Sequence, residues 1–329
     1  MNIEVKNLRN SIFGVLPKFR DWPCSVFLNP KYLLLKTTKS LPTMNTKIHS
    51  LYEDYKNGGI NRRDFLRKLT LYAGGAAAAA ALLPLLGENN ARASAPPEDE
   101  TGLVTEFITY PGETGEMKAF LARPEKKMKY PAVIVIHENR GLQPHIQDVT
   151  RRMAKEGFLS LAPDGLSPLG GTPENDPDKA RTMIGELNAE QTTKNFVAAV
   201  KYLETHPLST GKVGCTGFCW GGAMTNQVAV NAPSLDAAAP YYGRTPAPED
   251  VARIKAPVMA HYAGDDARIN EGIPAFEEAL KKAGIEYKIF IYEGAQHAFN
   301  NDSNPERYNE QAAKLAWERT IAFFKEKLK

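Results

Sequence analysis

The residues of this sequence best suited to chemistry surround Cys219, in the stretch Gly217-Phe218-Cys219-Trp220-Gly221. A cysteine thiolate is a strong nucleophile, and a glycine two positions to either side lets the backbone pass close to a strained central residue. The apolar run 213–216 and the helix-compatible run 223–230 predict strand, turn and helix around it. A helix N-terminus beneath Cys219 favours a thiolate and a developing oxyanion. If Cys219 were only a small buried apolar residue, both glycines would lack a purpose.

A cysteine nucleophile needs a base to take its proton and an acid to orient that base. His297 follows a predicted strand at 287–292, and two aspartates follow a predicted strand at 258–262. The chain order of nucleophile, acid and histidine is that of the α/β-hydrolases. We expect His297 to be the base and Asp266 to orient it, because Asp266 reaches further from the strand end. Asp265 is the alternative.

Strands and helices alternate over residues 103–329. An antiparallel hairpin is expected at 104–110 and 117–123. Further strands are expected at 131–136, 158–162, 213–216, 237–242, 258–262 and 287–292, and helices at 146–155, 179–187, 190–205 and after Cys219. This alternation predicts an α/β-hydrolase fold, with a mostly parallel central sheet and helices on both faces. The stretch 165–178 has no periodicity and is expected to form a pocket wall.

Five motifs over residues 103–329 resemble the dienelactone hydrolase (carboxymethylenebutenolidase) family of α/β-hydrolases. They are His137-Glu138-Asn139-Arg140-Gly141, Ala162-Pro163-Asp164, Gly217 to Gly222, Ala263-Gly264-Asp265-Asp266 and His297-Ala298-Phe299. The resemblance implies that Cys219, His297 and Asp266 are nucleophile, base and orienting acid. It also implies that Glu138 hydrogen-bonds the resting nucleophile and shifts when substrate binds, which helps to generate the thiolate.

Acyl chemistry requires two N–H donors directed at the tetrahedral oxyanion. The backbone amide of Trp220, directly after the nucleophile, is expected to be one donor, and the amide of Asn139 the second.

The family resemblance also implies two arginines that hold a substrate carboxylate, but this sequence has Asn301 and Pro168 at those positions. Arg181, Arg244 or Arg268 could bind substrate instead, although each is at least as compatible with a solvated surface charge.

The composition is that of an ordinary soluble chain, with 329 residues, 43% hydrophobic and 24% charged. A formal net charge of +3 argues against nucleic-acid partners. Six scattered histidines and three cysteines, Cys24, Cys215 and Cys219, show no metal-ligand spacing. We expect free thiols, no metal and no organic cofactor.

A paired arginine, Arg62-Arg63, precedes a weakly apolar run at 69–86 and a segment at 91–95 with small residues at alternate positions. This order resembles a twin-arginine export signal, and we expect cleavage near Ala93 to Ala95 and a periplasmic protein. An uncleaved membrane anchor is the alternative. Because paired arginines normally stand near a chain start, Met44 is an alternative to Met1 as the start. The predicted organisation is a non-native or unstructured extension at 1–43, a signal segment at 44–95 and the hydrolase domain at 96–329.

Together these observations predict an exported hydrolase that cleaves a small ester or lactone, similar to a dienelactone, through a thioester on Cys219. Its partners would be that small-molecule substrate and the export machinery, with only transient membrane contact if the signal is cleaved. A small-acyl esterase or thioesterase of the same fold is an alternative. A catalytically inactive exported binding protein is the alternative from another class.

Overall fold

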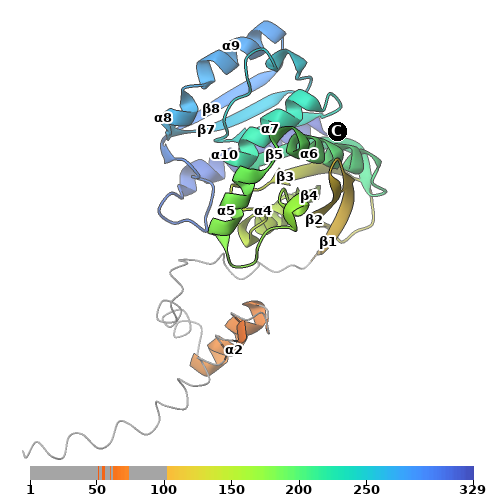
Figure 1. Cartoon of the computed structure of the whole chain (residues 1–329), viewed down its shortest axis with the longest axis vertical. Coiled ribbons are helices and arrows are strands. Elements are labelled where there is room, and N and C mark those ends of the chain that lie inside the picture. Colours follow the sequence, from red (N-terminus) through yellow and green to blue (C-terminus); the bar gives the residue numbers. More distant parts are fainter. Residues whose placement is uncertain (1–50, 52–53, 56–59, 61, 74–101) are drawn as a thin grey trace, which may run out of the picture. The chain divides into compact units, whose positions relative to one another are not determined.

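The computed structural model describes residues 51, 54–55, 60, 62–73 and 102–329 (Figure 1). In the first part, helix α2 spans Arg62–Ala73 and buries Phe65 and Leu69. None of the helices in the described ranges combines the length and the apolar character that a bilayer crossing requires. The extension at 1–43, the alternative start at Met44 and the expected cleavage near Ala93 to Ala95 fall outside the described residues.

The second part of the chain is built on one eight-stranded sheet with the order β1-β2-β4-β3-β5-β6-β7-β8. The strands are β1 (Leu103–Gly112), β2 (Gly115–Pro124), β3 (Tyr130–Ile136), β4 (Leu159–Pro163), β5 (Ser209–Phe218), β6 (Ala237–Tyr241), β7 (Val258–Asp265) and β8 (Tyr287–Gln296). β2 pairs antiparallel with β1 and β4, and every other pairing is parallel. The predicted hairpin and the mostly parallel sheet are confirmed.

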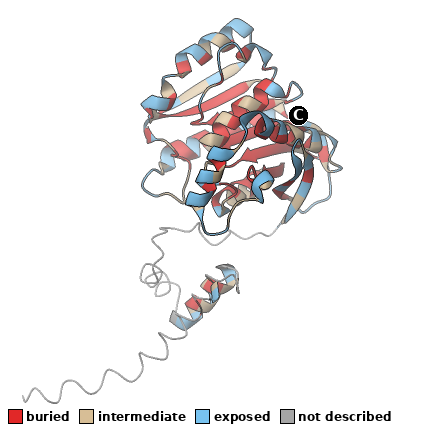
Figure 2. Ribbon diagram, in the orientation of Figure 1, coloured by how far each residue is buried: buried red, intermediate tan, exposed pale blue. Residues whose placement is uncertain are grey.

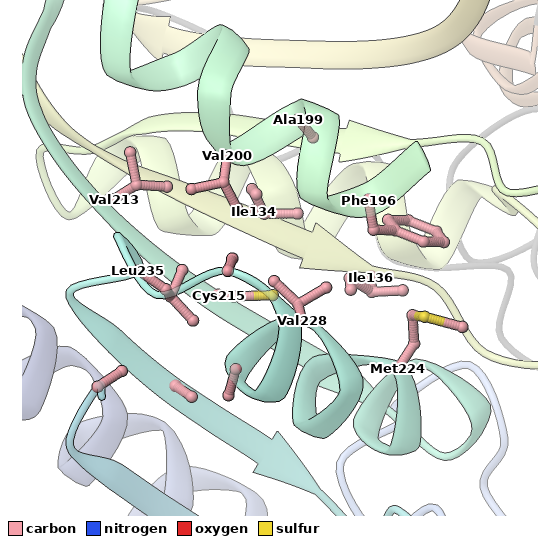
Figure 3. Packing of buried hydrophobic residues seen from close by; sticks show 14 of the residues in the cluster. Ile134, Ile136, Phe196, Ala199, Val200, Val213, Cys215, Met224, Val228 and Leu235 are labelled. Carbon is pink, nitrogen blue, oxygen red and sulfur yellow. The ribbon is translucent and has the colours of Figure 1, made fainter. Parts of the chain in front are cut away.

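Helices cover both faces of this sheet. Successive side chains of a strand point to opposite faces, and in the central strands both sets are apolar, so each face has to be covered. On β3, Ile134 and Ile136 point to the face covered by α6 (Ala189–Thr205), α7 (Trp220–Asn231) and α9 (Ile273–Ala283). Val133 and Val135 point to the opposite face, which α4 (Pro144–Lys155) and α10 (Glu310–Lys327) cover. The central strands are buried and the outer helix surfaces exposed (Figure 2). Figure 3 shows Val228 of α7 and Val200 of α6 packed over β3 and β5.

Three strands extend well beyond their predicted bounds: β5, predicted at 213–216, spans Ser209–Phe218, and β7 and β8 are also longer. In β7 and β8 the reason is local. β7 continues through Gly264 to Asp265, and β8 continues through Gly294 to Gln296, with a register shift between them after Ala263. A Cβ on Gly264 would stand 2.9 Å from the carbonyl oxygen of Tyr292, and Gly294 has a φ of +68°. These glycines mark a β-bulge inside the pair, where the sequence suggested strand ends.

The remaining differences are small. The stretch 165–178 contains a short 3-10 turn, Ser167–Leu169, and the start of α5 (Pro177–Glu186). Helix α9 was not predicted, and the short α8 (Ala267–Asn270) follows β7 directly.

The register brings the carboxyl ends of the parallel strands β3 to β8 to one edge of the sheet. Ile136 pairs with Gly217, Phe218 pairs with Tyr241, and Asp265 pairs with Gln296. The residues that follow these strands therefore lie along the same edge of the sheet, where α/β proteins hold their ligands.

Candidate active site

Cys219 occupies the sharp turn between β5 and α7. Its φ of +56° and ψ of −112° lie in a region that residues with a Cβ rarely adopt, so the turn is strained. Its amide donates to the carbonyl of Tyr241 at 3.1 Å, and its carbonyl accepts from Ala223 at 3.1 Å to begin the helix. The predicted strand, turn and helix around Cys219 are confirmed.

The flanking glycines allow the backbone to pass at close range. A Cβ on Gly217 would stand 2.4 Å from the carbonyl oxygen of Gly221, and a Cβ on Gly221 would stand 2.4 Å from the carbonyl oxygens of Ile136 and His137. These contacts are shorter than any side chain tolerates, so the turn that exposes Cys219 requires glycine at both positions.

The surroundings of Cys219 favour the protonated form of its thiol. Burial and the negative charge of Glu138 raise its pKa to about 11, although the backbone N–H of Trp220 and the charge of Arg268 act in the opposite direction. A thiolate at Cys219 would therefore have to be generated from the protonated thiol.

Cys215, four residues earlier, has a different environment. Its side chain is fully buried, its Sγ lies 3.8 Å from Thr225 Oγ1, and burial raises its pKa to about 12. Both cysteines are free thiols, as predicted, and Cys215 belongs to the core.

His297 and Asp266 form a direct pair at the ends of β8 and β7. His297 Nδ1 and Asp266 Oδ2 are 2.5 Å apart, and the Asp266 side chain is 8% exposed. Asp265 is exposed and pairs in the strand with Gln296. The pairing therefore selects Asp266 as the partner of His297, and its charge also contributes to the raised pKa of Cys219.

Tyr242 lies next to His297 and close to Cys219 and Glu138. It follows β6 with a φ of +36°, and its ring centroid lies 5.2 Å from that of His297. Burial, together with the charge of Glu138, raises the pKa of Tyr242 well above its ordinary value. Glu138, Cys219 and His297 are thus all neighbours of one buried tyrosine.

The carboxylate of Glu138 is held by Asn301. Asn301 Nδ2 donates to Glu138 Oε2 at 2.7 Å. Within residues 102–329 Glu138 makes no hydrogen bond to Cys219, so the resting contact implied by the family resemblance is not formed here. Asn301 is a neutral donor and does not compensate the negative charge of Glu138. That charge raises the pKa of the Cys219 thiol.

The two expected oxyanion donors belong to elements that meet at Cys219. The amide of Trp220 is the first of α7 and acts on the thiol. The amide of Asn139 lies in the loop after β3 and donates to no acceptor within residues 102–329.

The expected substrate-binding arginines differ in position. Arg268, on α8, is exposed and lies close enough to Cys219 for its charge to lower the pKa of the thiol. Arg181 is exposed on α5, and Pro168 lies in the 3-10 turn Ser167–Leu169. No cluster of three or more histidine, cysteine or acidic side chains suited to a metal occurs in the described ranges.

Several residues that the structure places around this site were not predicted from the sequence. His137 packs beneath Trp220, and Asp302 joins the loop after β8 to Arg152. Asn301 was considered only as a position at which the family resemblance implies an arginine. His137 was visible in its motif, but the partners of Asn301 and Asp302 lie 163 and 150 positions away in the chain, and no local pattern marks them.

The strand order and the turn at Cys219 define an α/β-hydrolase. The model of the Dienelactone hydrolase family matches residues 117–328, and the chain belongs to this family, whose members are hydrolases acting on ester or lactone bonds.

Similar proteins include a Saccharolobus solfataricus protein named "Putative carboxymethylenebutenolidase", 33% identical over 66% of this chain and 97% of its own length. An Escherichia coli protein of the same name is 32% identical over 70% of this chain and 89% of its own. A solved structure of a Klebsiella pneumoniae protein named "Putative Dienelactone Hydrolase" is 28% identical, with a TM-score of 0.60, over 68% of this chain and 98% of its own.

Proposed function

We propose that this enzyme hydrolyses a small ester or lactone through a triad of Cys219, His297 and Asp266. The observation that carries the proposal is the His297–Asp266 pair, placed by β7 and β8 at the edge where β5 presents the strained Cys219. A histidine whose Nδ1 is engaged by a carboxylate has Nε2 available to take a proton from a nucleophile.

In the proposed course the thiol proton passes to His297 and the thiolate attacks the carbonyl carbon. The amides of Trp220 and Asn139 bind the oxyanion. The tetrahedral adduct collapses, His297 returns the proton to the departing alkoxide, and a thioester to Cys219 remains. Water activated by His297 then hydrolyses the thioester, releasing the carboxylic acid and restoring the thiol. A lactone would follow the same steps with the alcohol retained in the product.

The resting thiol has a chemical advantage for an exported protein. A protonated thiol oxidises less readily than a permanent thiolate, and the pKa of Cys219 is raised to about 11 by burial and by Glu138. The proposed role of Glu138 is to keep the thiol protonated until substrate binds, and then to help generate the thiolate.

The substrate is proposed to be a small neutral acyl compound, which makes a small-acyl esterase or thioesterase the second candidate. Asn301 and Pro168 occupy the positions of the two carboxylate-binding arginines of the family resemblance, and Asn301 is occupied with Glu138. Arg268 is the one proposed substrate-binding cation whose charge reaches Cys219.

The proposal is tested by capturing the acyl-enzyme. The full chain is incubated with p-nitrophenyl acetate and with small lactones that carry or lack a carboxylate, and the acyl mass is mapped. We expect the adduct on Cys219, loss of turnover in His297→Ala, and retention of both in the matched control Cys215→Ala. If no ester or lactone is hydrolysed and Cys219 resists alkylation, the inactive binding-protein alternative replaces this proposal.

Export is proposed from the paired arginines at the start of α2 and the apolar run that follows them in sequence. Replacing Arg62 and Arg63 together by lysine keeps the charge but removes the paired arginine, so the precursor should accumulate in the cytoplasm. Cell fractionation measures this, and unchanged delivery to the periplasm would remove the twin-arginine proposal.

A further inference from the structure

His137 is a completely buried histidine beside the candidate nucleophile. It directly precedes Glu138, and its ring stacks on that of Trp220 with centroids 5.2 Å apart and an interplanar angle of 12°. His137 Nε2 accepts a hydrogen bond from the amide of Gly165 at 2.9 Å. His137 Nδ1 lies 2.7 Å from the backbone carbonyl oxygen of Glu138.

These two contacts define the state of the ring. Because Nε2 accepts from an N–H group, it carries no proton, and the single proton of a neutral imidazole is on Nδ1. Nδ1–H therefore donates to the Glu138 carbonyl. Burial lowers the pKa of His137, although the charge of Asp164 and the backbone hydrogen bond to Glu138 oppose this effect. Both ring nitrogens are engaged, so the ring is a fixed neutral donor and is not placed to act as a base.

The Glu138 carbonyl belongs to the same peptide plane as the amide of Asn139. In a trans peptide the C=O and the N–H point in opposite directions, and no cis bond occurs in the described residues. A hydrogen bond that fixes the Glu138 oxygen therefore also fixes the direction of the Asn139 N–H. That N–H is the second of the two proposed oxyanion donors.

The first donor depends on the same ring. Trp220 supplies the other amide, and its indole stacks on His137. Gly165 makes room for both rings, since a Cβ there would stand 3.0 Å from His137 Nε2 and 3.2 Å from the Trp220 ring. His137 thus contacts both proposed donor residues. It stacks on the side chain of Trp220, and it hydrogen-bonds the peptide plane that contains the Asn139 amide.

The far end of the Asn139 loop is held separately. Thr172 Oγ1 accepts from the amide of Leu142 at 2.8 Å and donates to Asp164 Oδ1 at 2.7 Å. The loop is therefore fixed through Thr172 at residue 142 and through His137 at residue 138. Of these two contacts, only the one with His137 acts on the peptide plane that carries the Asn139 amide.

We propose that His137 is a positioning residue of the oxyanion hole, which sets the direction of the Asn139 amide by donating to the Glu138 carbonyl. This inference rests on the proposed acyl-transfer function and goes beyond it by assigning the residue that orients one donor. His137 itself does not touch the substrate.

Two substitutions distinguish the hydrogen bond made by His137 Nδ1 from the one made by His137 Nε2. The amide nitrogen of asparagine can stand where Nδ1 stands, so His137→Asn can keep the donation to Glu138. The longer His137→Gln places its amide near the position of Nε2 and removes that donation. Loss of an oxyanion donor typically lowers turnover by about 100- to 1000-fold. A misdirected donor should therefore lower the rate of Cys219 acylation by about 10- to 100-fold in His137→Gln, with KM nearly unchanged, and less in His137→Asn.

The deciding measurement compares two reactions of the same thiol in the full chain. Acylation by p-nitrophenyl acetate forms an oxyanion, whereas alkylation by iodoacetamide does not. We expect acylation to fall in His137→Gln and to be retained substantially in His137→Asn, with alkylation of Cys219 unchanged in both. A parallel fall in both reactions, or equal acylation in the two variants, would overturn the inference.

A second variant covers the case in which His137→Gln does not fold. Gly165→Ala places a Cβ against His137 Nε2 and should displace the ring without altering it, again lowering acylation and sparing alkylation; normal acylation there would overturn the inference. Absence of any acyl-enzyme in the wild type overturns the proposed function and this inference together. An acylating wild type with insensitive variants overturns the inference alone.

Discussion

Glu138 places a negative charge beside a thiol, and Asn301 holds that charge in position at 2.7 Å. The charge is the second cause, after burial, of the raised pKa of Cys219. At the scale of single residues, a carboxylate that does not touch Cys219 therefore influences the protonation of this proposed nucleophile. Asn301 is neutral and does not compensate the negative charge of Glu138. An arginine at position 301 would compensate it.

Replacing Glu138 by glutamine should have two separable effects. Removing the charge lowers the pKa of Cys219, so the pH midpoint of its alkylation by iodoacetamide should move down by about one unit. Turnover should nevertheless fall, because the variant lacks the carboxylate that is proposed to help generate the thiolate once substrate binds. Glu116→Gln, which neutralises an exposed carboxylate on β2, is the control. Unchanged turnover in Glu138→Gln would exclude Glu138 from the mechanism, and an unchanged midpoint would exclude its electrostatic role.

Adjacent aspartates provide a matched pair of substitutions. Asp266→Asn removes the charge that meets His297 Nδ1 at 2.5 Å, and turnover should fall by about 100- to 10,000-fold. Asp265→Asn changes an exposed carboxylate and should alter turnover by less than about twofold. Both variants should retain the wild-type circular dichroism spectrum. A larger loss in Asp265→Asn than in Asp266→Asn would reverse the assignment of the orienting acid.

At the scale of elements, the loop after β8 is fixed to α4. Asp302 Oδ2 lies 2.5 Å from Arg152 Nη2, and Asp302 Oδ1 lies 3.1 Å from Nδ1 of the buried His145. Burial opposes the charge of Asp302, but the contacts with His145 and Arg152 outweigh it and lower its pKa to about 2. Because this loop also carries His297 and Asn301, α4 positions two groups of the candidate site that lie outside its own sequence.

Asp302→Ala should therefore affect activity as well as stability. Losing a hydrogen-bonded charge should cost about 1 to 3 kcal/mol of unfolding free energy. Displacement of the loop should reduce kcat/KM by about tenfold, since small misplacements of reacting groups are costly. Denaturant unfolding and p-nitrophenyl acetate kinetics measure the two effects. Glu306→Ala, an exposed position on the same loop, should change neither. A destabilised Asp302→Ala variant with wild-type kinetics would show that the α4 contact does not position the site.

The sequence predicted those elements whose signals are local. The hairpin of β1 and β2, the buried β3 and the turn at Cys219 follow from apolar runs bounded by glycine or proline. It underestimated β7 and β8, because a glycine in a bulge and a glycine that ends a strand have the same local pattern. Nothing local could predict that Asn301 binds Glu138, since these residues are 163 positions apart and meet only through the sheet order.

At the scale of the whole molecule, a buried polar network around His261 joins three strands at one end of the sheet to the C-terminal helix. His261 Nδ1 lies 2.9 Å from the Tyr292 hydroxyl, and Nε2 lies 3.0 Å from Thr320 Oγ1, which in turn lies 2.6 Å from the Tyr241 hydroxyl. Arg319 donates to Tyr292 and lies 3.9 Å above the Phe290 ring. The network joins β6, β7, β8 and α10, so its protonation state bears on the stability of the fold.

Burial, assisted by the positive charge of Arg319, lowers the pKa of His261 to about 3 from its ordinary value of 6.5. The unfolded chain therefore binds a proton at this residue between about pH 6.5 and pH 3, and the folded chain does not. Stability consequently falls as pH drops through that window, by up to about 1.4 kcal/mol per pH unit from this residue. Above pH 6.5 the contribution is constant.

His261→Gln removes this titration while keeping a polar side chain in the network. The variant should be less stable than the wild type at pH 7.5, since glutamine cannot reproduce both hydrogen bonds. The difference in unfolding free energy should then narrow as pH falls from 6.5 to 4.5. In this range His261 binds a proton in the unfolded wild type but not in the folded wild type, and the variant has no histidine at this position. Urea unfolding of the full chain at a series of pH values measures the difference. A gap that stays constant over this range would mean that His261 is protonated equally in the folded and unfolded states, and that another group controls the acid stability of the fold.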